Sequence, residues 1–370
     1  MVKRKALQDN ILNSWLKQLF VQLVVERTGI KVRENDQEVF ERIIATRLQS
    51  LGLSFPEEYY QLLEAQTQAS EAEWKSFIAE ITNSESFFFR DKGQIKLLKD
   101  YLLPELIRAR RGEKTLRICS AGCSTGEEPY SIAMLLQDLI PDFQTWEITI
   151  LGVDLNAAAV EKARTGLYRP WSFRGVDPAL KQRFFTEKGG LCCIAQSIKD
   201  MVYFQTGNLL QDDFRSLEFS LESMDLIVCR NVFIYFSDAA IEQVLDKFYH
   251  ALNPDGYLLV GHAELHSQKL TQFRVKVFEE SIAYQRSPGA TSVRPRPQHV
   301  PSTRRLSASE AAPKDLRSLN QQLEGNTTKM QQSALGLLRQ LPADMRIPRL
   351  GNLTASELIA QIEQNLNATK

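Results

Sequence analysis

Hydrophobic positions in the first 80 residues repeat with the spacing of α-helices. Apolar side chains recur every three or four residues, which places them on one face of each helix. The helices predicted from this pattern cover Trp15–Val24, Val39–Leu48, Pro56–Leu63 and Glu71–Ile81. Leu51-Gly52-Leu53 is expected to end the second helix, because glycine is common just after a helix end. Residues 1–82 are therefore expected to form a small all-helical domain.

From Thr115 onward, short apolar runs alternate with amphipathic stretches. The strands predicted there are Leu116–Cys119, Ile148–Val153, Met201–Gln205, Asp225–Cys229 and Tyr257–Gly261. The helices predicted between them are Pro129–Leu139, Asn156–Arg164 and Asp238–Leu252. The last helix is expected to stop at Asn253-Pro254-Asp255-Gly256, and Pro129 is expected at the first helical position. Alternating strands and helices predict an α/β fold with a parallel sheet that is covered on both faces.

The alternation of strands and helices is broken in two places. Phe273–Phe278 and Ser281–Gln285 flank Glu279-Glu280 and predict a terminal hairpin that adds one antiparallel strand. Residues 166–200 fit the alternation poorly and are expected to be an insertion, with its turn at Gly189-Gly190. The second predicted domain therefore covers residues 83–286.

The composition changes again after Arg286. Ser, Thr and Arg are frequent there, together with a group of prolines at positions 288, 295, 297, 301 and 313. Such a stretch buries too little apolar surface to offset its chain entropy, so residues 287–370 are expected to be a flexible linker and tail. Weak helical patterns at Leu335–Leu341 and Leu353–Leu366 suggest helices that bind a partner, or an unstructured tail.

Charge and composition exclude several classes of protein. The 370 residues carry 45 Lys and Arg against 45 Asp and Glu, and this balance argues against binding of nucleic acid by bulk charge. The sequence has no apolar run long enough for a membrane span and no signal peptide, so a cytoplasmic protein is expected. The five cysteines form no CxxC pair, and His262 and His266 lack a third nearby ligand, so no metal site is predicted.

The strongest local chemical signal is the run from Ser120 to Pro129, placed between the first predicted strand and helix. Open parallel sheets bind nucleotide-like ligands at this position. Gly122 and Gly126 are expected to let the backbone approach a ligand. Glu127 and Glu128 would repel a pyrophosphate and suit a ligand with an adenosine and a cationic end. The alternative is that these acids serve only as favourable charges at a helix N-terminus.

Two further polar residues follow predicted strands. Asp154 ends the second strand, where a carboxylate can accept hydrogen bonds from both hydroxyls of a ribose; its alternative role is to cap the next helix. Asn208 follows the next strand, where its amide could reach an adenine. Together with the glycine-rich run, these residues point to S-adenosylmethionine as the cofactor.

Further motifs resemble the CheR family of chemotaxis receptor glutamate methyltransferases. They are Ser84-Glu85-Ser86-Phe87-Phe88-Phe89-Arg90, Gly122 to Tyr130, Cys229 to Phe236, and Gly261-His262-Ala263-Glu264. The resemblance covers about residues 10–286. It implies a helical N-terminal domain, a class I methyltransferase domain, and a small β-subdomain inserted at about 166–200. Phe87-Phe88-Phe89 also has a plain alternative, and at least one of the three is expected to serve only core packing.

The resemblance also implies the site residues. Arg90 and Tyr235 fall beside the transferable methyl group. The cofactor-binding positions are Ser84, Ser86, Arg90, Gly122, Glu128, Asp154, Asn208, Leu209, Cys229, Arg230 and Asn231. Ser84 and Ser86 stand where the family usually has Asn and Thr. Ser86 keeps a hydroxyl, whereas Ser84 shortens a donor that Asn83 could replace.

The implied activity is methyl transfer from S-adenosylmethionine to glutamate side chains of chemoreceptor cytoplasmic domains. Two alternatives remain open: methylation of nitrogen on another protein, and a cofactor-binding scaffold that signals through its tail. The family's receptor-docking helix is typically rich in arginine. Here the matching helix has Arg42 and Arg47 but also Glu38 and Glu41, so a mixed-charge solvated face is equally possible.

Overall fold

The computed structural model describes residues 12–287, apart from 267 and 269, and a few positions between 346 and 363. The chain divides into two compact units, Leu23–Thr291 and a second that combines Met1–Gln22 with Ser292–Lys370. In the second unit, strand β11 (Arg346–Ile347) pairs antiparallel with β12 (Leu353–Thr354). The stretch Leu353–Leu366, predicted as a helix, therefore begins with a strand, and of its described positions 356–357, 359–360 and 363 are helical. The predicted linker from 288 and the helix at Leu335–Leu341 lie outside the described residues.

The helices predicted before the sheet are confirmed. They are α1 (Ser14–Thr28), α2 (Gln37–Leu51), α3 (Pro56–Glu64) and α4 (Gln68–Ile81), with a 3-10 turn η1 (Glu34–Asp36) before α2. Gly52 ends α2 in the left-handed conformation at φ 68°. Phe77 of α4 lies among Phe40, Tyr59 and Trp74, with ring centroids 5.7–6.1 Å apart. This aromatic cluster is the core of α2–α4.

Residues 92–109 form a helical stretch that the sequence pattern did not predict. It consists of α5 (Lys92–Leu97), a π-helical turn η2 (Leu98–Leu102) and α6 (Leu103–Ala109). Pro104 interrupts the apolar pattern and is typical of a helix stop, yet here it is the second residue of α6, directly after the π-helical turn within one helical run. The buried leucines of this stretch pack against the main sheet.

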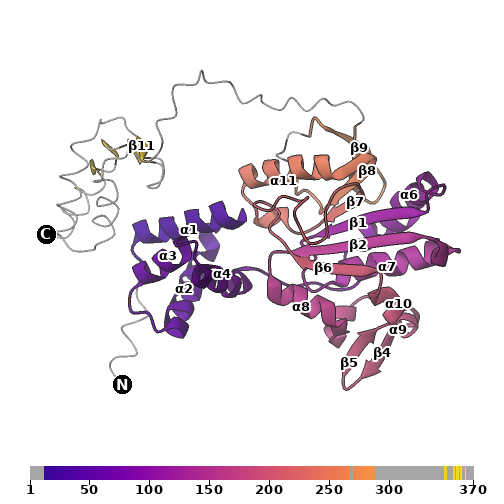
Figure 1. Cartoon of the computed structure of the whole chain (residues 1–370), viewed down its shortest axis with the longest axis horizontal. Helices are drawn as coiled ribbons and strands as arrows, with labels where there is room; N and C mark the ends of the chain where they lie inside the picture. Colours follow the sequence, from indigo (N-terminus) through magenta and orange to yellow (C-terminus); the bar gives the residue numbers. More distant parts are fainter. Residues whose placement is uncertain are drawn as a thin grey trace. The chain divides into compact units, whose positions relative to one another are not determined.

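The main sheet has seven strands in the order β6-β2-β1-β7-β8-β10-β9 (Figure 1). The strands are β1 (Thr115–Ala121), β2 (Glu147–Asp154), β6 (Val202–Thr206), β7 (Met224–Cys229), β8 (Leu252–Val260), β9 (Phe273–Val277) and β10 (Ile282–Arg286). The pairs among β6, β2, β1, β7 and β8 are parallel, and β10 runs antiparallel to both neighbours. The predicted parallel sheet with one antiparallel strand is confirmed.

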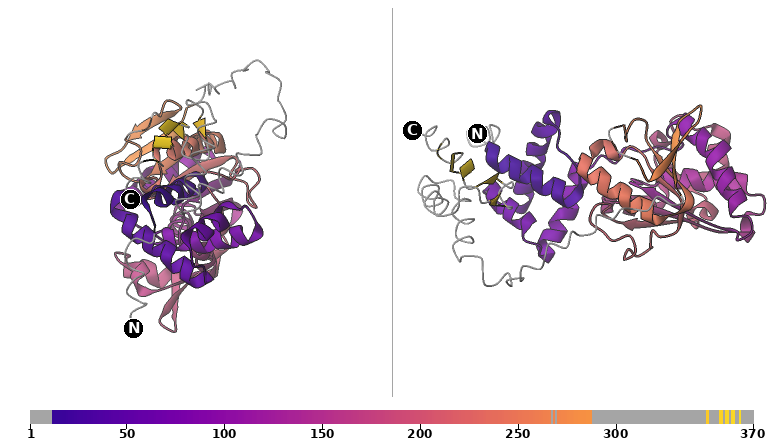
Figure 2. Two further views of the ribbon diagram at one scale, coloured as in Figure 1. Left: turned by 90° about the vertical axis from the view of Figure 1, so that its left-hand side faces the viewer. Right: turned by 90° about the horizontal axis from the view of Figure 1, so that it is seen from above.

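Helices cover both faces of this sheet, as Figures 1 and 2 show. Ile118 of β1 belongs to the cluster with α7 (Glu127–Leu139) and α8 (Ala157–Thr165), whereas Cys119 belongs to the cluster with α11 (Asp238–Ala251). Successive side chains of a strand point to opposite faces, so each buried strand contributes side chains to the hydrophobic core on both faces of the sheet.

Two predicted boundaries are wrong. Helix α7 begins at Glu127, so Pro129 is its third residue rather than its first. A proline is still tolerated there, because the first four N–H groups of a helix have no partner within it. Helix α11 ends at Ala251, just before Asn253-Pro254-Asp255-Gly256, as predicted. Strand β8, however, begins at Leu252 rather than at Tyr257 and contains this run, and its pairing with β7 shifts register between Met224 and Leu226. Asp255 adopts a φ of 63°, so the turn-forming residues produce a bulge in a continuing strand.

The expected insertion folds as a separate three-stranded sheet that projects from the main sheet (Figure 1). Its strands are β3 (Leu167–Tyr168), β4 (Phe185–Lys188) and β5 (Leu191–Ile194), with η4 (Pro170–Phe173), α9 (Pro178–Phe184) and α10 (Gln196–Lys199) around them. Gly189 and Gly190 form the β4–β5 turn, both at positive φ, as predicted. Phe88 packs against Tyr168, Phe173 and Phe185 with ring centroids 4.7–5.0 Å apart, which attaches this sheet to the core.

Candidate active site

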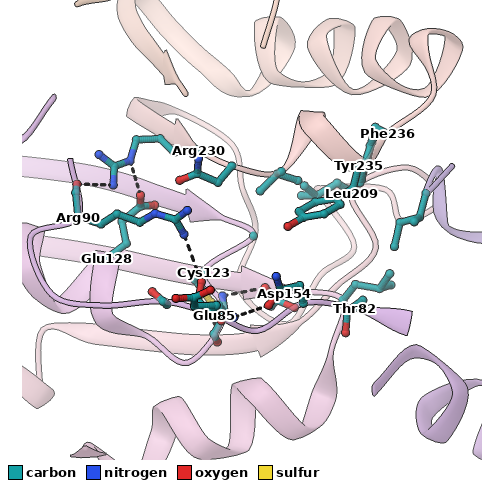
Figure 3. Close-up of a pocket in the computed structure, with 18 of the residues that line it drawn as sticks. Thr82, Glu85, Arg90, Cys123, Glu128, Asp154, Leu209, Arg230, Tyr235 and Phe236 are labelled. Atoms are coloured by element: carbon teal, nitrogen blue, oxygen red, sulfur yellow. Dashed lines mark hydrogen bonds and ion pairs between the residues drawn. The ribbon is translucent and has the colours of Figure 1, made fainter. Parts of the chain in front are cut away.

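A cavity of about 1100 Å³, including its open mouth, lies where β1, β2, β6 and β7 end. The parallel strands all present their carboxyl ends to this edge, where sheets of this kind bind ligands. Of the predicted site residues, the cavity is lined by Ser86, Arg90, Gly122, Glu128, Asp154, Asn208, Leu209, Arg230, Asn231 and Tyr235. Ser84 and Cys229 are not among its lining residues. Arg90, Glu128 and Arg230 lie on one side, and Tyr235 and Phe236 on the other (Figure 3).

Asp154 faces the cavity from the end of β2 and does not cap a helix. Its two carboxylate oxygens accept hydrogen bonds from the backbone N–H of Ser124 (2.7 Å) and Asn156 (2.8 Å). The cap of α8 is instead Asn156, whose side chain accepts from Ala158 and Ala159. Burial raises the pKa of Asp154, and the two N–H groups act in the opposite direction. Each carboxylate oxygen keeps accepting capacity for a ligand hydroxyl.

The glycines of the loop after β1 are required by the protein's own packing. A Cβ on Gly122 would lie 2.3 Å from Cγ2 of Val232, in the loop after β7. A Cβ on Gly126 would lie 2.8 Å from that of Ala163 and 3.0 Å from the hydroxyl of Tyr168. Both glycines also adopt positive φ. The space beside each glycine belongs to neighbouring side chains. Gly122 also lines the cavity, and the expectation that it lets the backbone approach a ligand stays a prediction.

Glu127 and Glu128 start α7 but have different environments. Glu127 is buried and accepts hydrogen bonds from Thr125 Oγ1 (2.6 Å) and Ser172 Oγ (3.1 Å), so it supports the loop and the inserted sheet. Glu128 lines the cavity and accepts from Ser120 Oγ at 2.7 Å. Only the second acid is therefore placed to meet a ligand.

Glu128 and Arg230 form an ion pair across the loops after β1 and β7. The Nε of Arg230 donates to Glu128 Oε2 at 2.8 Å, and their side chains are 3% and 15% exposed. Arg230 also donates to the Gln94 side chain (3.3 Å) and the Arg90 carbonyl (2.8 Å). Gln94 is itself held by the Val260 carbonyl. The pair is thus fixed by α5 and β8, which no sequence motif indicated.

The segment before the sheet forms another part of the wall. Arg90 donates to the Glu85 carbonyl (3.2 Å), and its guanidinium lies 5.6 Å from the ring centre of Phe87. Phe87 and Phe89 line the cavity, whereas Phe88 is 1% exposed in the core. The prediction that one of the three phenylalanines serves only packing is confirmed.

Ser84 and Cys229 are turned away from the cavity. The Ser84 carbonyl accepts from Ser124 Oγ, and its hydroxyl accepts from Asn156, so this serine fixes the β1 loop. Asn83 lines the cavity next to it, with its Oδ1 bound to the Glu85 N–H. Cys229 ends β7 with its side chain in the α11 core at 0% exposure, and burial raises its thiol pKa well above the usual range. As side-chain contacts to a ligand, these two predictions are not supported.

The loop after β6 is held by Asn208, which the sequence singled out, and by Lys247, which it did not. Asn208 uses its Oδ1 for the N–H groups of Leu210 and Gln211, and its Nδ2 donates to the Arg27 carbonyl at 2.7 Å. One amide hydrogen of Asn208 remains for a ligand. Lys247 of α11 donates to the carbonyls of Leu209, Leu210 and Asp212, which uses all three of its protons.

The helical part of the chain also reaches the cavity. Thr28 ends α1 and Ile30 lies just after it, Ile81 ends α4 and Thr82 follows it, and all four are lining residues. The Thr82 hydroxyl accepts from Asn156 Nδ2 at 2.9 Å. Nothing in the local sequence marks these residues, because their contribution depends on contacts far along the chain.

The cavity suits S-adenosylmethionine in its chemistry. Asp154 offers a carboxylate for ribose hydroxyls, Leu209 and Phe89 offer apolar surface for a base, and Glu128 with Arg90 offers both charges for an amino-acid end. Within the described part of the chain, no group of three or more His, Cys, Asp or Glu is arranged to hold a metal ion.

The sheet order, the single antiparallel strand and this cavity define a class I, Rossmann-like methyltransferase. The sequence matches the description "CheR methyltransferase, SAM binding domain" over residues 84–281 and "CheR methyltransferase, all-alpha domain" over residues 18–82. The chain therefore belongs to the CheR methyltransferase family, and its cofactor is S-adenosylmethionine.

Curated relatives support this placement. The chain is 34% identical to a chemotaxis protein methyltransferase of Escherichia coli, over 69% of this chain and 86% of that protein. It is 32% identical to the protein of that name from Salmonella typhimurium, over 69% and 85%. It is also 32% identical to a probable biofilm formation methyltransferase, WspC, of Pseudomonas aeruginosa, over 66% and 56%.

Proposed function

We propose that this methyltransferase transfers the methyl group of S-adenosylmethionine to glutamate side chains in the cytoplasmic domain of a chemoreceptor, forming methyl esters. Two relatives at 32% and 34% identity are named chemotaxis protein methyltransferases. Within the described residues, no helix is both long and apolar enough to cross a membrane. A receptor's cytoplasmic domain is the acceptor that agrees with the relatives' names.

The charge balance around the cavity carries this proposal. The lining carboxylates of Glu85, Glu128 and Asp154 are each engaged, by Arg174 (2.8 Å), by Arg230 (2.8 Å) and by two backbone N–H groups. Among the described residues Arg90 pairs with no carboxylate, so its charge is available to the carboxylate end of the cofactor. An amine acceptor would need free carboxylate or carbonyl groups around it, and the lining carboxylates are already engaged. The lining residues of the cavity thus favour a carboxylate acceptor.

The methyl transfer then requires alignment of the reacting groups rather than transfer of a proton. Bound S-adenosylmethionine supplies an electrophilic methyl group on a sulfonium. A glutamate with a pKa of about 4.3 is already ionised at neutral pH, so no general base is needed.

Arg90 would hold the carboxylate end of the cofactor, and the Tyr235 hydroxyl would orient the acceptor oxygen. A direct ion pair of Arg90 with the attacking oxygen would lower its nucleophilicity, so contact with a hydroxyl is the better arrangement. Phe87, Phe236 and Val232 would exclude water.

Replacement of Tyr235 by phenylalanine tests the assignment of the acceptor side. Tyr235→Phe should lower kcat on a receptor fragment by roughly 10- to 100-fold, because the acceptor oxygen loses its orienting contact. The Kd for S-adenosylhomocysteine, measured by calorimetry, should stay unchanged. Equal losses in turnover and in S-adenosylhomocysteine affinity would contradict this role, because they would place Tyr235 in cofactor binding.

Helix α2 matches the receptor-docking helix of the family, but its surface is not rich in arginine. Arg47 of α2 donates to both carboxylate oxygens of Glu73 at 2.8 and 2.7 Å, and Glu73 also accepts from the Tyr59 hydroxyl. Arg47 therefore belongs to the structure of the helical domain, and Arg42 is the arginine of α2 left at the surface. We accordingly expect Arg42→Ala to raise KM for the receptor only slightly, as a single exposed charge is worth little.

A cofactor-binding scaffold without activity is the competing proposal. Release of S-adenosylhomocysteine, measured with and without a receptor fragment, separates the two. Release that depends on the fragment supports the enzyme, and binding of cofactor without release supports the scaffold. The likeness to a biofilm formation methyltransferase makes a receptor outside chemotaxis a second acceptor to include in this assay.

A further inference from the structure

The segment Gly29–Arg33, here called the strap, lies between α1 and η1 and runs along the loop that carries Tyr235. The Lys31 N–H donates to the Tyr235 carbonyl at 2.8 Å, and the Ser237 N–H donates to the Gly29 carbonyl at 2.9 Å. Ile30 and Phe236 form an antiparallel bridge between these two hydrogen bonds. The strap is therefore paired with the loop like a short added strand.

A side chain extends this pairing. The Nη2 of Arg33 donates to the Ile234 carbonyl at 2.6 Å. The strap thus contacts the backbone at 234, 235, 236 and 237, on both sides of Tyr235. Arg33 itself is exposed and does not line the cavity, so its contribution is made through the loop.

The strap is also fixed on its other side. Gly29 has a φ of +79°, and a Cβ there would lie 3.0 Å from the Cβ of Ala240 and 3.2 Å from the ring of Phe236. The Thr28 hydroxyl donates to the Val24 carbonyl at the end of α1 and accepts from the Ile30 N–H. Only glycine combines this φ with this close approach to α11, so the position of the strap is closely specified.

The loop that carries Tyr235 has little regular secondary structure of its own. Tyr235 ends η5 (Phe233–Tyr235), a single 3-10 turn, and Asn231 before it adopts a φ of 60°. Short 3-10 turns have poorer hydrogen-bond geometry than α-helices, and a non-glycine residue at positive φ is strained. Contacts from outside the loop must therefore supply the orientation of Tyr235.

We propose that the strap positions Tyr235 for methyl transfer, so that the segment following α1 sets the geometry of the acceptor side of the active site. This role rests on the proposed function of Tyr235 as the residue that orients the acceptor. Gly29, Lys31 and Arg33 are positioning residues: they act on the reaction through the backbone of residues 234–237. Weakening the strap lowers turnover and leaves the cofactor side of the cavity intact.

Arg33→Met in the full chain tests this role, with Arg33→Lys as the conservative variant. Amide hydrogen exchange at Lys31 and Ser237 should accelerate in Arg33→Met, and kcat on a receptor fragment should fall about three- to tenfold. The Kd for S-adenosylhomocysteine should change by less than about twofold. Arg33→Lys keeps a donor and should restore most of both properties. Gly29→Ala should lower kcat further.

Arg108→Met is the matched control, because it removes an exposed hydrogen bond from an arginine to a carbonyl, Pro104, outside the cavity. It should change neither the exchange at Ser237 nor kcat. Arg33→Met with unchanged exchange and unchanged kcat would overturn the proposal. So would equal losses of turnover and of S-adenosylhomocysteine affinity, since the strap would then support the whole cavity. The exchange measurement needs no acceptor, so it remains decisive if the carboxylate assignment fails.

Discussion

Two walls of the cavity are built in different ways. The sheet-edge wall, formed by Gly122–Ser124, Glu128 and Asp154, is held by neighbouring strands of one sheet, as in the bond from the Ser124 N–H to Asp154. The wall around Tyr235, proposed above to face the acceptor and here called the acceptor wall, is hydrogen-bonded to the strap, about 200 residues away in the sequence. The sheet-edge wall is therefore intrinsic to the methyltransferase domain, whereas the acceptor wall depends on the meeting of that domain with the segment that follows α1. This difference predicts that cofactor binding and turnover can be damaged separately.

Loss of the buried ion pair should have the largest effect. Arg230→Met leaves the Glu128 carboxylate without its cation in a poorly solvated position, which typically costs roughly 3–5 kcal/mol of folding free energy. The affinity for S-adenosylhomocysteine should also fall by about 100-fold. Thermal unfolding and calorimetry measure the two effects.

The double variant Glu128→Gln/Arg230→Met sharpens this prediction. It should regain most of the lost stability, because no buried charge remains unpaired, while cofactor affinity stays low. If the single variant is as stable as the wild type, the sheet-edge wall does not depend on the pair.

Lys247→Met should have a smaller effect than Arg230→Met. Unlike the strap variants, it should weaken cofactor binding rather than turnover. It removes the donor for the carbonyls of Leu209, Leu210 and Asp212, so the loop after β6 loosens. S-adenosylhomocysteine affinity should fall by about tenfold, with kcat at saturating cofactor nearly unchanged. A fall in kcat with unchanged affinity would contradict the division between the two walls.

Glu264 should give an effect of another kind, visible only as a dependence of stability on pH. Burial raises its pKa from 4.5 to about 7, against the backbone N–H groups of Gly261 and Asn231 and the charge of Arg230. The folded state therefore binds this proton more tightly than the unfolded state. Its stabilising contribution is complete below about pH 4.5 and is lost as the pH rises through about 7.

The Glu264→Gln variant isolates this contribution. From about pH 5 to pH 8, the wild type should lose stability relative to Glu264→Gln, by about 3 kcal/mol at most. Thermal melts of both proteins at the two pH values measure the difference. A constant difference would show that Glu264 keeps the same charge in the folded and unfolded protein.

The sequence predicted the parts of the molecule that depend on local pattern. Asp154 was predicted because it ends a buried strand, and Gly189-Gly190 because paired glycines suit a tight turn. The strap, Lys247 and Gln94 were missed, since their roles arise from backbone contacts between segments far apart in the sequence, and such contacts leave no local signature. Gly122 is an intermediate case. The sequence identified the glycine, but the reason for it, the position of the Val232 side chain, is visible only in the folded structure.

The central claim, transfer to a carboxylate, is tested most directly by the chemistry of the product. A methyl ester has a carbonyl that hydroxide attacks, whereas an N-methyl group has no comparable leaving path. Labelled methyl should be transferred from S-adenosylmethionine to membranes that contain chemoreceptors and then released as volatile methanol in mild alkali. Label that remains on the protein through alkali would contradict the claim and favour the N-methyltransferase alternative.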